Sequence, residues 1–227
     1  MHRLDTITLP ESLILLAIDD DSGRLDSNSG ALDLALAGAV LTELLLRGDV
    51  TLINGNLIAV ESSRPDDDVL DAALTAIRAS RPRDSKHWVK NLGKIQIRNR
   101  LLDRLIERGI IRREEHRILW VFPADRFPTE DAAPERALRQ AIRAIVIEGA
   151  TVTPQPRTAA LIALLTSANL TGMVFDRDER NHYKNRIDAV ASGELMGEAV
   201  ATAVKDAQAA VTAAIIASTA AATIANS

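Results

Sequence analysis

The stretch that decides the fold is Leu36-Ala-Gly-Ala-Val-Leu-Thr-Glu-Leu-Leu-Leu-Arg-Gly48, followed closely by Val50-Thr-Leu-Ile53, Asn54-Gly55-Asn56 and Leu57-Ile-Ala-Val60. Apolar residues recur here at steps of three and four, which predicts a helix over residues 31–47 that ends at Gly48. The two short apolar runs flank an Asn-Gly pair, the strongest short-range signal for a β-hairpin. The unit is therefore predicted to be a helix, a glycine and a hairpin.

The same order recurs about sixty residues later along the chain. Leu105-Ile-Glu-Arg-Gly109 matches Leu44-Leu-Leu-Arg-Gly48, and the apolar pair Ile110-Ile111 and the run Ile118-Leu-Trp-Val-Phe122 flank a charged turn predicted at Glu114-Glu115. A helix followed by a small hairpin is the outline of a winged-helix unit. Two copies predict an internal duplication, with units at about 9–62 and 66–123.

The remaining segments predict a mainly α-helical fold. Residues 11–18 form a short helix or strand that ends in the turn Asp19-Asp-Asp-Ser-Gly23, and residues 66–68 cap a helix over 69–79. Beyond Pro123 the strand signals stop. Further helices are expected over 129–148, 158–170, 178–191 and 194–225. No linker forces a split, so residues 1–227 are predicted to be one domain with a helical half at 129–225.

Composition removes most catalytic chemistries. The 227 residues include no cysteine, which excludes disulfides, thiolate metal sites and cysteine nucleophiles. The four histidines stand far apart and form no helical ligand pair, and the glycine motifs of nucleotide-binding and hydrolase folds are missing. Turn formation and helix capping explain the aspartate triplets at 19–21 and 66–68 better than metal binding does. We expect a protein that is not an enzyme and uses no cofactor or metal.

No segment predicts export or a membrane span. The apolar run at residues 13–18 is too short. Residues 207–225 carry no charge, but alanine and threonine dominate them and contribute little to membrane insertion. A helix that packs closely through small side chains is the better interpretation. The expected location is the cytoplasm, with a peripheral position on the inner face of a membrane as a possibility.

The charge distribution is the most informative feature. The formal net charge is −4, yet residues 78–117 carry 13 Lys and Arg against 5 Asp and Glu, a local net charge of +8. Within this basic stretch, cations recur at helical steps of three to six, so that several can share a face. They are Lys86, Lys90, Lys94, Arg98 and Arg104 or Arg108. We single out Lys90, Lys94 and Arg98 as candidate anion-binding residues, because lysine and arginine bind phosphate well.

Several interpretations of this stretch remain open. It can be a solvated surface whose cations pair with carboxylates. It can bind an anionic phospholipid headgroup or another phosphorylated ligand. Winged-helix units also occur in proteins that read duplex DNA, so nucleic acid is an alternative partner. A third hypothesis is a scaffold for protein partners or self-association, partly through the alanine-rich C-terminal helix. The sequence leaves the oligomeric state undetermined.

Three phrases in order resemble the Golgi phosphoprotein 3 family, including its many bacterial members. They are Leu9-Pro-Glu-Ser-Leu-Ile-Leu-Leu-Ala-Ile18, Leu36 to Gly48, and Arg98-Asn-Arg-Leu-Leu-Asp-Arg-Leu-Ile-Glu-Arg-Gly109. The resemblance covers the chain from Leu9 to about Ala222. It implies a mainly helical fold with small β-hairpins. In eukaryotic relatives it implies a peripheral membrane protein that binds phosphatidylinositol 4-phosphate and recruits the cytosolic tails of Golgi glycosyltransferases.

The resemblance also implies where a headgroup pocket would lie. The family builds it from a tryptophan and an arginine around the first long helix and two arginines at the start of the second. These four positions fall at Asn28, Ala37, Ile95 and Arg98, and Lys94 stands beside Ile95. Arg98 alone keeps the residue type of the family.

Overall fold

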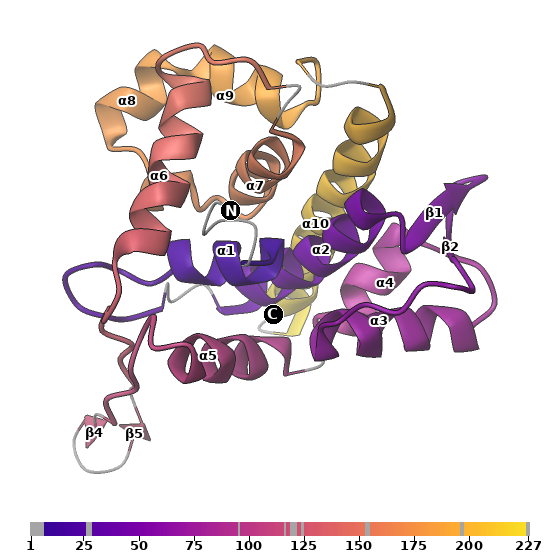
Figure 1. Ribbon diagram of the computed structural model, residues 1–227, viewed down its shortest axis with the longest axis horizontal. Helices are drawn as coiled ribbons and strands as arrows, with labels where there is room; N and C mark the ends of the chain where they lie inside the picture. The colour runs from indigo at the N-terminus through magenta and orange to yellow at the C-terminus, as the bar shows by residue number, and fades with distance from the viewer. Residues whose placement is uncertain are drawn as a thin grey trace.

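Helix α1 (Leu9–Leu16) is the helix around which much of the molecule packs, and all of its residues are buried. In the computed structural model (Figure 1), α1 contacts α2, α5, α6 and α7. Thr8 caps its N-terminus, Glu11 completes a capping box, and Pro10 fits the first turn, which needs no N–H donor there. The segment expected to be a short helix or strand is therefore a helix.

The structure describes residues 7–25, 29–94, 96–115, 117–118, 122–123, 125–152, 155–195 and 198–225. The other α-helices in these ranges are α2 (Ser29–Arg47), α3 (Asp68–Ala79), α4 (Ser85–Leu92), α5 (Ile97–Glu107), α6 (Ala133–Val146), α7 (Pro156–Ser167), α8 (Arg177–His182), α9 (Lys184–Ala191) and α10 (Glu198–Ala225). The strands are β1 (Val50–Ile53), β2 (Asn56–Ala59), β3 (Arg83–Asp84), β4 (Arg117–Ile118) and β5 (Phe122–Pro123). A short 3-10 helix, η2, spans Thr171–Met173.

The predicted order of helix, glycine and hairpin around Gly48 is confirmed. Helix α2 ends at Arg47, and Gly48 adopts φ +76°, a left-handed conformation that glycine reaches without a steric penalty. Strands β1 and β2 pair antiparallel in the register Val50 to Ala59. Asn54 and Gly55 both have positive φ, as a type I′ hairpin turn requires. The sequence did not predict β3, which pairs with β2 and completes a three-stranded sheet.

The second hairpin differs from its prediction. Glu114 bridges Arg126 and Ile111 bridges Thr129, so the chain does not reverse at Glu114-Glu115 but continues outward. The short strands β4 and β5 pair beyond that point, away from the helices (Figure 1). The predicted turn was wrong because Ile110 and Ile111 are buried against the helices and do not pair with the later apolar run. The proposed duplication, its unit boundaries and the single-domain assignment stay predictions.

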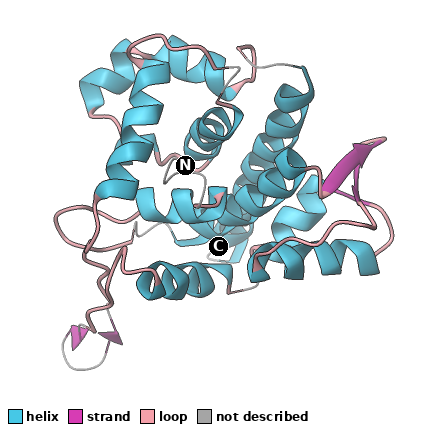
Figure 2. Ribbon diagram, in the orientation of Figure 1, coloured by secondary structure: helices cyan, strands magenta, loops and turns pink. Residues whose placement is uncertain are grey.

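The C-terminal half is helical, as predicted, but its boundaries shift. Helix α6 begins at Ala133 because Thr129 is held by its bridge to Ile111, and the helix expected over 178–191 is divided at Tyr183 into α8 and α9. Figure 2 shows helices as the dominant elements and strands only at the margins, so the predicted mainly α class with small hairpins is confirmed. Within the described ranges, no helix combines the length and apolar character that crossing a membrane requires.

Candidate anion-binding face

The three predicted site residues lie where α4 ends and α5 begins. Lys90 is exposed in the last turn of α4, and Lys94 is exposed in the turn that follows. Arg98 lies in the first turn of α5 and is partly exposed. We call these three residues the basic face. Whether it binds an anion stays a prediction.

A break in the helix changes how these cations are arranged. Gly93 ends α4 and α5 starts only at Ile97, so Lys90, Lys94 and Arg98 do not follow the steps of one continuous helix as the spacing had suggested. Gly93 packs tightly at this point: a β-carbon there would lie 3.0 Å from the Val89 carbonyl oxygen and 3.1 Å from the Leu34 side chain. A glycine directly after the last apolar residue of α4 is an ordinary stop signal and could have predicted the break.

Arg98 is joined to α2 by an ion pair. Its Nη2 lies 2.8 Å from Oδ1 of Asp33, with 22% and 37% of the two side chains exposed. Burial raises the pKa of Asp33, and the charge and hydrogen bond of Arg98 oppose that rise. An anion that binds Arg98 therefore has to compete with a carboxylate, but with one that is partly desolvated.

The N-terminus of α5 carries donor groups of its own. The capping residue, Gln96, makes no side-chain hydrogen bond to the backbone of the first turn. The first N–H groups of a helix have no partners within the helix, and they carry a partial positive charge. Helix α5 thus presents backbone donors next to Arg98 and Lys94.

The other positions that the family resemblance singles out carry no basic residue. Asn28 and Ile95 lie outside the described residues. Ala37 is completely buried within α2. Of the four positions, Arg98 is the one that the structure describes with a basic side chain at the surface.

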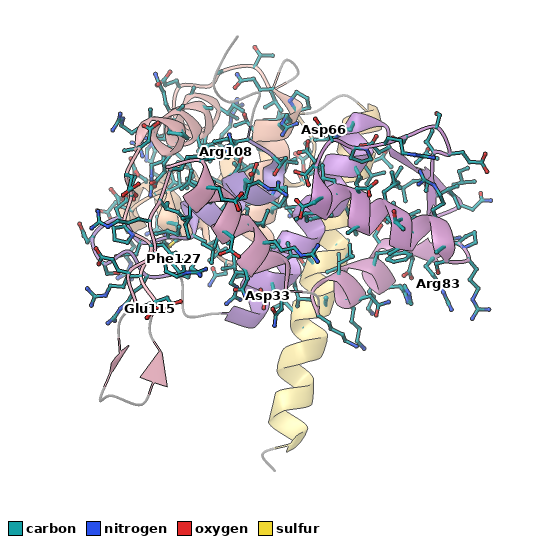
Figure 3. All side chains as sticks on the ribbon, turned by 60° about the horizontal axis from the view of Figure 1, so that its bottom comes forward. Asp33, Asp66, Arg83, Arg108, Glu115 and Phe127 are labelled. Carbon is teal, nitrogen blue, oxygen red and sulfur yellow. The ribbon has the colours of Figure 1, made fainter. Side chains whose placement is uncertain are left out.

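Arg104 and Arg108 do not join the basic face. They lie on a polar cleft of about 480 Å³, which we call the arginine cleft. Its lining consists of Ile7, Thr8, Glu11, Glu43, Arg47, Asp66, Asp67, Asp68, Arg104, Arg108 and Arg157. Arg104 binds Asp67 through two hydrogen bonds, of 2.5 and 3.4 Å, and also pairs with Asp68. Figure 3 shows Arg108 and Asp66 in the upper half of the view and Asp33 below them.

Two almost fully buried carboxylates organise this cleft. Glu11 accepts a hydrogen bond from the Thr8 backbone N–H through Oε2 and pairs through Oε1 with Arg108 at 3.2 Å. Glu43 accepts from the Leu9 backbone N–H and pairs with Arg157 at 2.7 Å. Because the carboxylates are occupied by helix N-terminal N–H groups and by arginines, the cleft is an internal ion-pair network. For Arg104 and Arg108, the interpretation as paired cations holds.

The aspartate triplets act as caps and turns, as predicted. Asp67 accepts hydrogen bonds from the Val69 and Leu70 backbone N–H groups at the start of α3. Asp19 accepts hydrogen bonds from the Ser22 hydroxyl and from the Ser22 backbone N–H, at 2.6 and 2.8 Å, and both lower the pKa of Asp19. Among the residues that the structure describes, no group of three or more His, Cys, Asp or Glu is arranged to hold a metal ion.

Comparison with known proteins identifies relatives of the chain. The family model described as Golgi phosphoprotein 3 (GPP34) matches residues 9–207. Vacuolar protein sorting-associated protein 74 of Eremothecium gossypii is 27% identical over 168 residues, which cover 64% of this chain and 50% of that protein. The protein of the same name from Schizosaccharomyces pombe is 25% identical over 220 residues, 80% of this chain and 65% of that protein. The chain thus matches between half and two-thirds of the length of these relatives.

Proposed function

The chain belongs to the Golgi phosphoprotein 3 family, and on this premise we propose that it is a non-enzymatic, adaptor-type protein that binds an anionic phospholipid headgroup through Lys90, Lys94 and Arg98. The binding places it peripherally on a membrane, where its other surfaces are available to protein partners. The family's specific headgroup, phosphatidylinositol 4-phosphate, is the first ligand to test. The phosphate of another anionic lipid headgroup would bind the same side chains.

One observation carries this proposal: two exposed lysines, one in the last turn of α4 and one in the turn after it, precede a helix that begins without a side-chain cap and has Arg98 in its first turn. Helix N-termini are common phosphate sites because their free N–H groups point at the ligand. Arginine adds a planar pair of donors, and each lysine adds a point charge. The combination suits a phosphomonoester better than it suits a neutral ligand.

In the proposed complex, Arg98 exchanges its partner. The guanidinium leaves Asp33, or shares its donors, and donates to a phosphate oxygen together with the first N–H groups of α5. Lys90 and Lys94 contribute attraction to the negatively charged surface, worth about 1 kcal/mol for each cation near an anionic membrane. Asp33 limits the affinity, because its carboxylate competes for Arg98.

Vesicle flotation tests the proposal. The full chain is floated with phosphatidylcholine vesicles and with vesicles that also contain phosphatidylglycerol or phosphatidylinositol 4-phosphate. We expect recovery with the acidic vesicles alone. Lys90→Glu/Lys94→Glu and Arg98→Glu should each lose most of that recovery.

A matched control changes the net charge by the same amount as Lys90→Glu/Lys94→Glu, but on another surface. Arg177→Glu/Lys184→Glu reverses two exposed cations on α8 and α9 and should leave the recovery unchanged. If the basic-face variants float as well as the unaltered chain, the proposed site is wrong. If the chain shifts duplex DNA with a steep dependence on salt and ignores vesicles, the nucleic-acid alternative replaces the lipid.

A further inference from the structure

The C-terminal helix continues past the part of the chain that matches the family. The family match ends at residue 207, whereas α10 runs to Ala225. From residue 207 onward the sequence contains no charged side chain and consists mainly of alanine with threonine, isoleucine and valine. This C-terminal segment of α10 is a feature that the family assignment leaves unexplained.

The body of the protein holds the first part of this segment. The Ser85 hydroxyl donates to Asp206, and Val211 is fully buried against Gly38 of α2. Ala214 is still buried, but 64% of Ile216 is exposed. Figure 3 shows α10 leaving the body close to Asp33 and extending past every other described helix.

A helical segment that projects from the body needs a further contact to stabilise its helical structure. Short isolated helices are marginal in water, and this segment has no charged pairs to support one. Its exposed side also carries an apolar groove lined in part by Gln208, Thr212, Ala213 and Ile216. Ile216 and Ile53 are the two large hydrophobic side chains that the described residues leave exposed.

The residues near the point where α10 leaves the body indicate what this segment contacts. Helix α10 packs against both α2 and α4, the helices that carry Asp33 and Lys90. Gly93, one residue before the exposed Lys94, packs against α2 at Leu34. The basic face and the part of α10 around the exposed Ile216 therefore lie in one region. Exposed cations beside an apolar helix end complement an anionic lipid surface, whereas a second copy would bring like charges together.

We propose that the C-terminal part of α10, from Ile216 onward, lies in the interfacial layer of the anionic membrane that the basic face binds. This inference rests on the proposed function and adds an apolar contact to it. The helix lies in the headgroup region and does not span the bilayer. Apolar side chains and cations then act together, as they do in other interfacial helices.

The absence of cysteine allows a direct test. Ile216→Cys carries an environment-sensitive fluorophore, and Ile53→Cys, at the other exposed isoleucine on β1, serves as the matched control. Vesicles of phosphatidylcholine are compared with vesicles of equal parts phosphatidylcholine and phosphatidylglycerol. We expect a blue-shifted, brighter emission for the label at 216 with the acidic vesicles and no change at 53.

Removal of residues 217–227 gives an independent measurement. This deletion keeps Val211 and Ala214 in place, and Ile216→Ser is a second, milder variant. We expect about tenfold weaker binding to acidic vesicles for the deletion and roughly fivefold for Ile216→Ser, in proportion to the apolar surface removed. Circular dichroism checks that both variants remain folded.

The outcomes separate the inference from the function beneath it. If acidic vesicles do not bind the full chain at all, the proposed function falls, and this inference with it. If they bind it, and Lys90→Glu/Lys94→Glu abolishes binding, but the label at 216 and the deletion change nothing, the inference alone is overturned. If light scattering shows a dimer that the deletion dissolves, with no spectral change on vesicles, the segment joins two copies and the inference is likewise overturned.

Discussion

Arg157 of α7 and Glu43 of α2 form an ion pair in which Nη1 and Oε1 are 2.7 Å apart, although 114 residues separate them in the sequence. Glu43 is 1% exposed and also accepts the Leu9 N–H, so this contact joins α7, α2 and the N-terminus of α1. The pair stabilises the packing of these helices because a buried carboxylate without a cation is costly.

Arg157→Leu should lower the free energy of unfolding by about 2 kcal/mol, because it leaves the Glu43 carboxylate without its cation. Urea denaturation measures the change. Arg157→Leu/Glu43→Gln should recover part of the loss, since the double variant removes the uncompensated charge. Arg177→Leu on the exposed surface of α8 is the control and should stay within about 0.5 kcal/mol of the unaltered chain. Equal losses for Arg157→Leu and Arg177→Leu would rule out the proposed role of the pair.

Asp67→Ala should destabilise the protein by about 2 kcal/mol. The change removes both the cap of α3 and an acceptor for Arg104. Asp66→Ala changes the neighbouring exposed carboxylate and should have an effect within about 0.5 kcal/mol. Thermal unfolding of the two variants side by side distinguishes a specific role of Asp67 from a general effect of charge in this loop.

Glu135 should make stability depend on pH. Burial, and next a hydrogen bond with Asp20, raise the pKa of Glu135 from its usual 4.5 to about 7, although Arg139 opposes the rise. Because the folded protein holds this proton more tightly than the unfolded chain does, the contribution is complete below about pH 4.5 and is lost as pH rises through 7. The loss is at most about 3 kcal/mol.

Glu135→Gln tests this dependence, because an amide keeps a donor for Asp20 without ionising. The variant should be more stable than the unaltered chain at pH 8 and should flatten the stability profile between pH 5 and 8. Glu179→Gln gives a contrast: the hydrogen bond from Arg143 lowers the pKa of Glu179, so its contribution is lost towards acid. A profile that Glu135→Gln leaves unchanged would contradict the assignment.

Gly38→Ala should weaken the packing of α10 against α2. A β-carbon at position 38 would lie 2.4 Å from the Val211 side chain, and the clash should cost about 2 kcal/mol. Val211→Ala in the same chain should recover part of that cost. Gly30→Ala, in the same helix with no atom within 4 Å of its new β-carbon, should instead stabilise by about 0.5 kcal/mol. Differential scanning calorimetry measures all three variants.

Asp33→Asn should strengthen binding to acidic vesicles. It removes the carboxylate that occupies Arg98, and it deletes one negative charge from the region that meets the lipid. We expect about fivefold tighter binding, the effect of roughly 1 kcal/mol per charge. Asp71→Asn on α3 provides the matched loss of one charge and should leave the affinity unchanged. Weaker binding of Asp33→Asn would show that the ion pair organises the site and does not compete with it.

Local signals in the sequence predicted the elements that depend on local chemistry. The periodic helix before Gly48, the Asn54-Gly55 turn and the cap at Asp67 each need only their near neighbours, and all three are present. The second hairpin was predicted wrongly because Ile110 and Ile111 have two possible partners. Burial against the helices competes with strand pairing, and packing decides the outcome.

The sequence was less able to predict which residues make up the candidate site. Local charge counting groups Arg104 and Arg108 with Lys90, yet their partners Glu11 and Asp67 stand far away in sequence. No periodicity within residues 78–117 encodes those contacts. The sequence therefore located the basic stretch but could not say that some of its arginines are used inside the fold.

The position of α1 has a consequence for synthesis of the chain. This helix is made before the groups that satisfy its buried N-terminus, which come from Glu43 of α2, from Arg108 just after α5 and from Arg157 of α7. A domain folds as a unit, and a contact between residues far apart in sequence can form only after both residues have been synthesised. The eight residues of α1 should thus stay open to proteases until α7 has emerged, although α1 leaves the ribosome well before α7 does.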